Sequence, residues 1–166
     1  MYRDAQSDAE SFTEYVMIGR AGLKRHAFLL CGDWHEADDL VQDTLTSVYR
    51  RWPDVSRRGE MESYAHTALV HRFVSVHRQT RWQRETPHPA PPDQPRTDDS
   101  AADDRMSMLA CLRRLPPRQR AVIVLRFWED LSIQQTAEAM GVSPGTVASQ
   151  HHRALTTLRQ SLADLR

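Results

Sequence analysis

Cysteine, glycine and aromatic residues are all scarce in this chain, and it has no long hydrophobic run. Its two cysteines, Cys31 and Cys111, lie far apart, so a disulfide framework is not expected and a reducing cytoplasm is the default location. No stretch of about 18 apolar residues could span a membrane, and the first ten residues lack the character of a signal peptide. We therefore expect a soluble intracellular protein without membrane insertion.

Catalytic signatures and strand patterns are missing as well. The sequence contains no nucleophile–base constellation, no P-loop and no dinucleotide fingerprint, so we assign no catalysis to it. No strand pattern of useful length and no internal repeat is visible, whereas Leu, Ala, Arg and Gln are abundant and favour helices. A length of 166 residues allows one ordinary domain or two small ones.

The net charge of zero argues at first against a nucleic-acid-binding protein, because such proteins are usually basic. The distribution of charge reverses that argument. Residues 63–85 carry four arginines against one glutamate, and eight arginines stand against four acidic residues after Met106. Residues 86–104 between them are rich in Pro and Asp and contain no large apolar residue, which predicts a disordered connector. The expected domains are therefore residues 1–85 and 105–166, joined by the linker 86–104.

Apolar residues recur at three- and four-residue spacing on both sides of this linker, which is typical of amphipathic helices. The predicted fold is all-α, with a three-helix bundle followed by a helix-turn-helix domain. Pro53 is expected to end the second helix, and residues 54–60 are expected to form a polar loop. The predicted helices span residues 9–30, 34–52, 61–82, 105–115, 117–128, 133–140 and 144–163.

Two of these helices are joined by a turn whose residues each have a local role. Ser132 and Gln135 form an S-x-x-Q capping box, which predicts a helix start. Gly141 suits the left-handed conformation that ends a helix, while Ser143 and Pro144 suit the first positions of the next one. One helix thus ends and another begins within about three residues, a spacing that fits a helix-turn-helix.

The second helix of this pair has two different faces. Its polar face would enter the DNA major groove, although a plain helical hairpin with a solvated outer face is the alternative. By helical spacing, the inward face consists of Val147, His151, Ala154, Leu155 and Leu158. The outward face consists of Thr146, Ala148, Ser149, His152 and Arg153.

Segments on both sides of the linker resemble a known protein family. Residues 115–159, from "LPPRQ" to "TTLR", resemble region 4 of the extracytoplasmic-function (ECF) sigma factors of bacterial RNA polymerase. Residues 31–52, "CGDWHEADDLVQDTLTSVYRRW", resemble their region 2.2, and residues 62–85 resemble their regions 2.3 and 2.4. The resemblance implies that the chain directs core polymerase to promoters and supports promoter opening.

The resemblance also implies partners and contact residues. The partners would be promoter DNA and core RNA polymerase, bound through its β′ coiled coil and β flap. An anti-sigma factor is a further candidate partner. An acidic face beside an apolar seam suits a basic helical partner. A solvated charged face would be the ordinary interpretation, but the string "DDLVQD" favours the partner. The core-binding residues would be Asp38, Asp39, Leu40, Gln42 and Asp43.

Two further sets of residues would contact the promoter. The −35 element would be read by the outward face given above; Ala148 and Gln150 stand where members often carry basic residues. The −10 element would be held as single strand, where aromatic, polar and arginine side chains are needed. His71 replaces the Asn of many members. The −10 set would be Tyr64, His71, Arg72, Ser75, Arg78, Arg81 and Trp82.

Other functions remain as alternatives. A polymerase-independent helix-turn-helix regulator would bind duplex DNA but would have no need of the acidic helix around Asp39. A protein-interaction module is kept open by Ala148 and Gln150. His26, Cys31 and His35 are close in sequence but lack a C-x-x-C pair, so we predict no metal and no cofactor.

Overall fold

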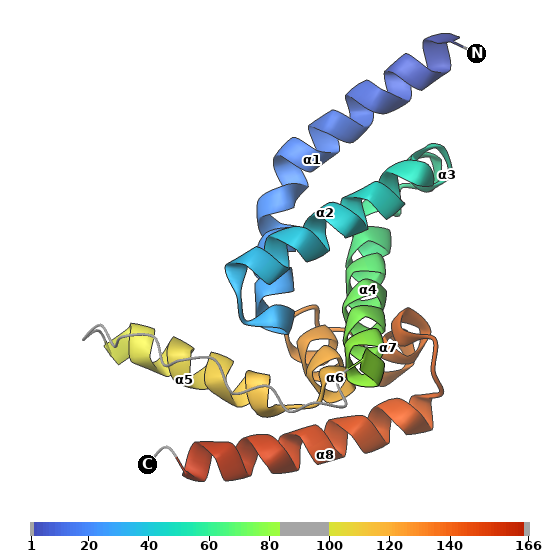
Figure 1. The fold of residues 1–166 in the computed structure, drawn as a ribbon. Coiled ribbons are helices and arrows are strands. Elements are labelled where there is room, and N and C mark those ends of the chain that lie inside the picture. Colours follow the sequence, from blue (N-terminus) through green and yellow to red (C-terminus); the bar gives the residue numbers. More distant parts are fainter. Residues whose placement is uncertain (1, 84–99, 165–166) are drawn as a thin grey trace. The chain divides into compact units, whose positions relative to one another are not determined.

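Only helices are present in the part of the chain that the computed structural model describes, which is the backbone of residues 2–83 and 100–164 (Figure 1). Side chains are described for residues 6–78 and 107–164. The predicted all-α fold is confirmed. The helices are α1 (Tyr2–Cys31), α2 (Trp34–Arg50), α3 (Trp52–Arg58), α4 (Met61–Gln83), α5 (Ser100–Arg114), α6 (Pro117–Phe127), α7 (Ile133–Met140) and α8 (Pro144–Ala163).

The described residues form two compact units; the first is built mainly of residues 2–73, and the second mainly of residues 74–83, 100–138 and 142–164. In the first unit α1 packs along α2, and α3 contacts both. Apolar side chains between these helices are buried away from water, and this burial is the main force that holds the helices together. The buried apolar residues of helices α1 to α4 are Leu23, Ala27, Leu29, Leu30, Cys31, Ala37, Leu40, Val41, Val48, Trp52, Val55, Ala65, Leu69, Val70 and Phe73.

The prediction of a polar loop after Pro53 is wrong, because the structure places helix α3 there. Pro53 lies in the first turn of α3, where a missing N–H is harmless, so it begins one helix instead of merely ending another. Trp52 is 1% exposed, and its Nε1 donates a hydrogen bond to Ser11 Oγ at 2.8 Å. Gly59 ends α3 in the left-handed region at φ 69°. The first four helices therefore replace the predicted three.

In the second unit α5 and α6 both pack on α8. Helix α5 begins at Ser100, so residues 100–104 of the predicted linker are helical, and residues 86–99 lie outside the described part. Arg120 of α6 is only 8% exposed, and its Nη2 donates to the carbonyls of Arg113 and Leu115 at 2.9 and 3.1 Å. This guanidinium joins the end of α5 to the start of α6.

Across the described ranges, every helix is too short or too polar to cross a lipid bilayer.

Candidate binding surfaces

The turn between α7 and α8 has the bonds that its sequence predicts. Ser132 N donates to Gln135 Oε1 at 2.8 Å, and Gln135 N donates to Ser132 Oγ at 3.1 Å, which completes the capping box. Gly141 ends α7 with φ 64°, and Ser143 Oγ accepts from Thr146 N at 3.2 Å to begin α8. These four residues confirm the predicted helix-turn-helix boundaries.

One face of α8 presents a short polar surface. Ala148, Ser149, His152 and Arg153 are exposed, whereas Thr146 is half-buried and its hydroxyl lies 2.9 Å from Ser143 Oγ. Thr146 is thus engaged in the helix start more than the other four residues of the predicted set. The residues predicted to face inward are buried or half-buried: Val147, His151, Ala154, Leu155 and Leu158.

His151 supports α8 from behind this polar surface. Its ring stacks on the exposed ring of Phe127 at the end of α6, with centroids 5.7 Å apart and an interplanar angle of 26°. Burial lowers the pKa of His151 below its ordinary value, and the charges of Arg126 and His152 lower it further. The neutral imidazole is therefore favoured, as expected for a side chain that packs instead of contacting phosphate.

Helix α2 presents an acidic face opposite its buried stripe. Asp39, Gln42 and Asp43 are exposed, whereas Leu40 is 6% exposed and packs in the core. Leu40 therefore fixes the position of the helix and offers almost no surface to a partner.

Asp38 is set apart from the other acidic residues of α2 because α1 supplies two cations to it. Lys24 Nζ lies 2.7 Å from Asp38 Oδ2, and Arg20 Nη2 lies 3.9 Å from Oδ1. The hydrogen bond from Lys24 lowers the pKa of the Asp38 carboxyl below its usual value. Lys24 also lies 5.4 Å from the ring centre of Trp34, which stacks on Phe28 at 4.0 Å.

Helix α4 carries most of the predicted −10 set on one face. At about 100° per residue, Tyr64, His71, Ser75 and Arg78 lie close together around the helix axis. His71 and Arg78 are exposed, and Tyr64 and Ser75 are half-buried. Arg81 and Trp82 belong to α4 by their backbone, but their side chains lie outside the described residues.

Arg72, the remaining member of that set, is turned toward α2. Its Nε and Nη2 both donate to Asp43 Oδ2, at 3.0 and 2.7 Å. The two side chains stay 48% and 52% exposed. A predicted DNA-binding residue and a predicted polymerase-binding residue are therefore bonded to each other, which their separation of 29 positions in the sequence did not indicate.

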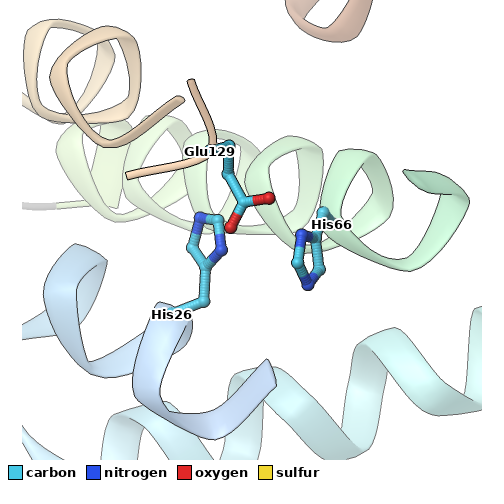
Figure 2. A group of neighbouring side chains, drawn as sticks. All are labelled: His26, His66 and Glu129. Atoms are coloured by element: carbon cyan, nitrogen blue, oxygen red, sulfur yellow. The ribbon is translucent and has the colours of Figure 1, made fainter. Parts of the chain in front are cut away.

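Two imidazoles also lie side by side in the first unit. The rings of His26 in α1 and His66 in α4 have centroids 4.8 Å apart at an interplanar angle of 61° (Figure 2). Glu129, the third residue labelled in that figure, belongs to the second unit. Of the other metal ligands weighed from the sequence, Cys31 is buried and His35 is exposed. His26 and His66 thus join α1 to α4 through an aromatic contact.

Comparison with known proteins matches both halves of the chain. The profile of sigma-70 region 2 matches residues 20–83, and that of sigma-70 region 4 matches residues 105–158. The RNA polymerase sigma-E factor of Streptomyces avermitilis is 37% identical over 165 residues, which cover 95% of this chain and 88% of that protein. The ECF RNA polymerase sigma factor SigL of Mycobacterium tuberculosis is 30% identical, over 87% of this chain and 85% of its own length.

This chain belongs to the ECF sigma factors of the sigma-70 family. The resemblance found in the sequence is thereby confirmed, and the family is one of transcription initiation factors, not of enzymes. The sigma factor RpoE of Bartonella quintana, solved with the anti-sigma factor NepR, shares the fold. It has a TM-score of 0.72 and 24% identity, and the match covers 95% of this chain and 99% of that one. Sigma region 2 thus holds α2, α3 and α4, and sigma region 4 holds α6, α7 and most of α5 and α8.

Proposed function

We propose that this sigma factor binds core RNA polymerase, brings it to promoter DNA and supports promoter opening, while polymerase itself performs the chemistry. The observation that carries the proposal is that one chain combines a region 2 match, with an exposed acidic face on α2, and a region 4 match, with an exposed polar face on α8. A polymerase-independent regulator would need only the second of these. The chain would act in the cytoplasm, as a non-catalytic subunit.

Core polymerase would dock on α2 through Asp39, Gln42 and Asp43. Their carboxylate and amide groups are exposed and suit a basic, helical partner such as the β′ coiled coil. Asp38 would contribute less, because Lys24 already holds its carboxylate. Leu40 would act indirectly, by packing α2 in place. The β flap would be contacted by region 4.

The −10 element would lie along the face of α4 that carries Tyr64, His71, Ser75 and Arg78. This face combines an aromatic ring, polar edges and a cation, which are the groups that hold an unstacked single strand. Arg81 and Trp82 of the predicted −10 set follow in the same helix.

The −35 element would be read by α8 in the major groove. Ser149, His152 and Arg153 can donate hydrogen bonds to base edges or phosphates, and the Ala148 methyl can contact a thymine methyl. Thr146 would serve mainly at the helix start, given its contact with Ser143. Because RpoE of Bartonella quintana was solved with an anti-sigma factor, we include such a protein among the partners to be tested.

Run-off transcription with purified core polymerase tests this function. Sheared genomic DNA of the source bacterium would be transcribed with core polymerase alone and with added chain, and the 5′ ends would be sequenced. We expect discrete start sites, preceded by two shared sequence elements, only when the chain is present. Start sites identical in both reactions, together with footprints produced by the chain alone on duplex DNA, would instead identify a polymerase-independent regulator.

A further inference from the structure

The ion pair between Asp43 and Arg72 joins the two surfaces of region 2 that the proposed function keeps apart. Asp43 belongs to the acidic face of α2, and Arg72 belongs to α4, which would hold the −10 strand. Both guanidinium donors converge on one carboxylate oxygen, at 2.7 and 3.0 Å. While the pair is formed, Asp43 cannot offer both carboxylate oxygens to an outside partner, and Arg72 cannot offer its Nε and Nη2 to a phosphate.

The direction of Arg72 on its helix supports the same conclusion. It is offset by about 100° from His71, away from the face shared with Tyr64, Ser75 and Arg78. Phe73, the next residue, is 1% exposed, so Arg72 sits at the border between the DNA-facing side and the packed side of α4. From that border a long, flexible arginine side chain can reach Asp43 on α2 or turn toward the outer face.

We propose that the Asp43–Arg72 pair is an exchangeable internal contact: a basic group of core polymerase takes Asp43, and the released Arg72 then binds a phosphate of the −10 strand. This exchange rests on the proposed function. Arg72 occupies Asp43 in the free chain, so it opposes polymerase binding at first and favours DNA binding afterwards.

The exposure of the pair makes such an exchange feasible. About half of each side chain is in contact with solvent, so either group can rehydrate when its partner leaves. Exposed pairs of this kind change an equilibrium by about 1.4- to five-fold, which corresponds to about 0.2–1 kcal/mol. Separation of a fully buried pair would instead leave an uncompensated buried charge, which opposes exchange.

The experiment measures the affinity of fluorescently labelled full-length chain for purified core polymerase, by anisotropy at low ionic strength. The proteins compared are wild type, Arg72→Gln, Asp43→Asn and the double variant, each checked for helicity by circular dichroism. Arg57→Gln serves as the matched control, because it breaks another exposed pair of the same unit, between Arg57 and Asp54 at 2.8 Å. Promoter binding by the corresponding holoenzymes is then measured at saturating core polymerase.

The expected results have opposite signs for the two partners. Arg72→Gln should bind core polymerase about two- to five-fold more tightly than wild type, yet its holoenzyme should bind promoter DNA more weakly. Asp43→Asn should bind core polymerase more weakly, and adding Arg72→Gln to it should make no further difference. The control Arg57→Gln should match wild type in its affinity for core polymerase.

Each other outcome overturns a defined part of the reasoning. Unchanged or weaker core binding by Arg72→Gln, with Asp43→Asn still impaired, overturns the exchange but leaves α2 as the docking helix. Tighter core binding without a loss of promoter affinity overturns the step to DNA. An unaffected Asp43→Asn overturns both the exchange and the role of Asp43, and a wild-type chain that does not bind polymerase overturns the proposed function itself.

Discussion

Removal of the capping box at the start of α7 should weaken the helix-turn-helix by a predictable amount. Helix α7 has only eight residues, so its own propensity contributes little and its first turn depends on Ser132 and Gln135. Ser132→Ala removes the acceptor of the 3.1 Å bond from Gln135 N and leaves that amide to solvent. We expect a loss of about 1 kcal/mol in the free energy of unfolding. This corresponds to a fall in melting temperature of about 4–8 °C for a domain of 60–100 residues.

Glycine at the same position also lacks the hydroxyl, but it leaves the free amides of the first turn open to water. Ser132→Gly should cost only a few tenths of a kcal/mol, because glycine is tolerated at the helix start although it lacks a hydroxyl. Gln135→Ala removes the acceptor of the other bond of the box, from the Ser132 amide, and should cost about 0.5–1.5 kcal/mol. Thermal unfolding of the full-length variants, followed by circular dichroism, measures all three. The exposed Ser63→Ala is the control and should stay within about 0.5 kcal/mol of wild type. A loss for Ser132→Ala no larger than that for Ser63→Ala would refute the capping argument.

Three further predictions concern single side chains. Because the pKa of His151 is lowered in the folded chain, the free energy of unfolding should fall as the pH drops from above 6.5 toward that lowered pKa. His151→Leu should reduce this fall. Equal melting curves at pH 5.5 and 7.5 for both proteins would contradict this prediction. Trp52→Ala should lower the free energy of unfolding in urea by about 3–5 kcal/mol. Ser11→Ala removes only the acceptor of the hydrogen bond from Trp52 and should cost about 1 kcal/mol. Similar losses for the two variants would show that Trp52 acts only through this hydrogen bond. Arg153→Ala should weaken binding of the holoenzyme to promoter DNA by about 1–3 kcal/mol if Arg153 contacts a base, and an unchanged footprint over the upstream element would show that α8 is oriented differently.

The parts of this fold that the sequence predicted are those decided by residues close together in the chain. Ser132, Gln135, Gly141 and Ser143 act on backbone groups within five positions of themselves, so the bounds of α7 and the start of α8 could be read directly. Leu40 belongs to the apolar stripe of α2 by its spacing, and the structure buries it there. The resemblance had placed Leu40 in the core-binding set, but a side chain that is only 6% exposed offers little surface to a partner.

The parts that the sequence did not predict depend on choices made by tertiary structure. Pro53 can end one helix or begin the next, and tertiary contacts of Trp52 favour the second, among them its packing against the ring of Phe12, with centroids 5.1 Å apart. The bond between Asp43 and Arg72 joins two helices, so periodicity within either helix could not reveal it. For the same reason the contact between His26 and His66 had no sequence signal.

The buried guanidinium of Arg120 changes how the salt dependence of DNA binding should be interpreted. Eight arginines follow Met106. Of these, Arg120 donates hydrogen bonds to two backbone carbonyls, and Arg126 donates to the carbonyl of Leu131. Each cation that neutralises a DNA phosphate releases about one condensed counterion, and these two side chains are committed to the protein instead. The slope of affinity against salt concentration would therefore be smaller than the count of eight arginines after Met106 suggests. Arginines of this kind stabilise the fold, so a total charge taken from the sequence overestimates the number of side chains that can bind DNA phosphates.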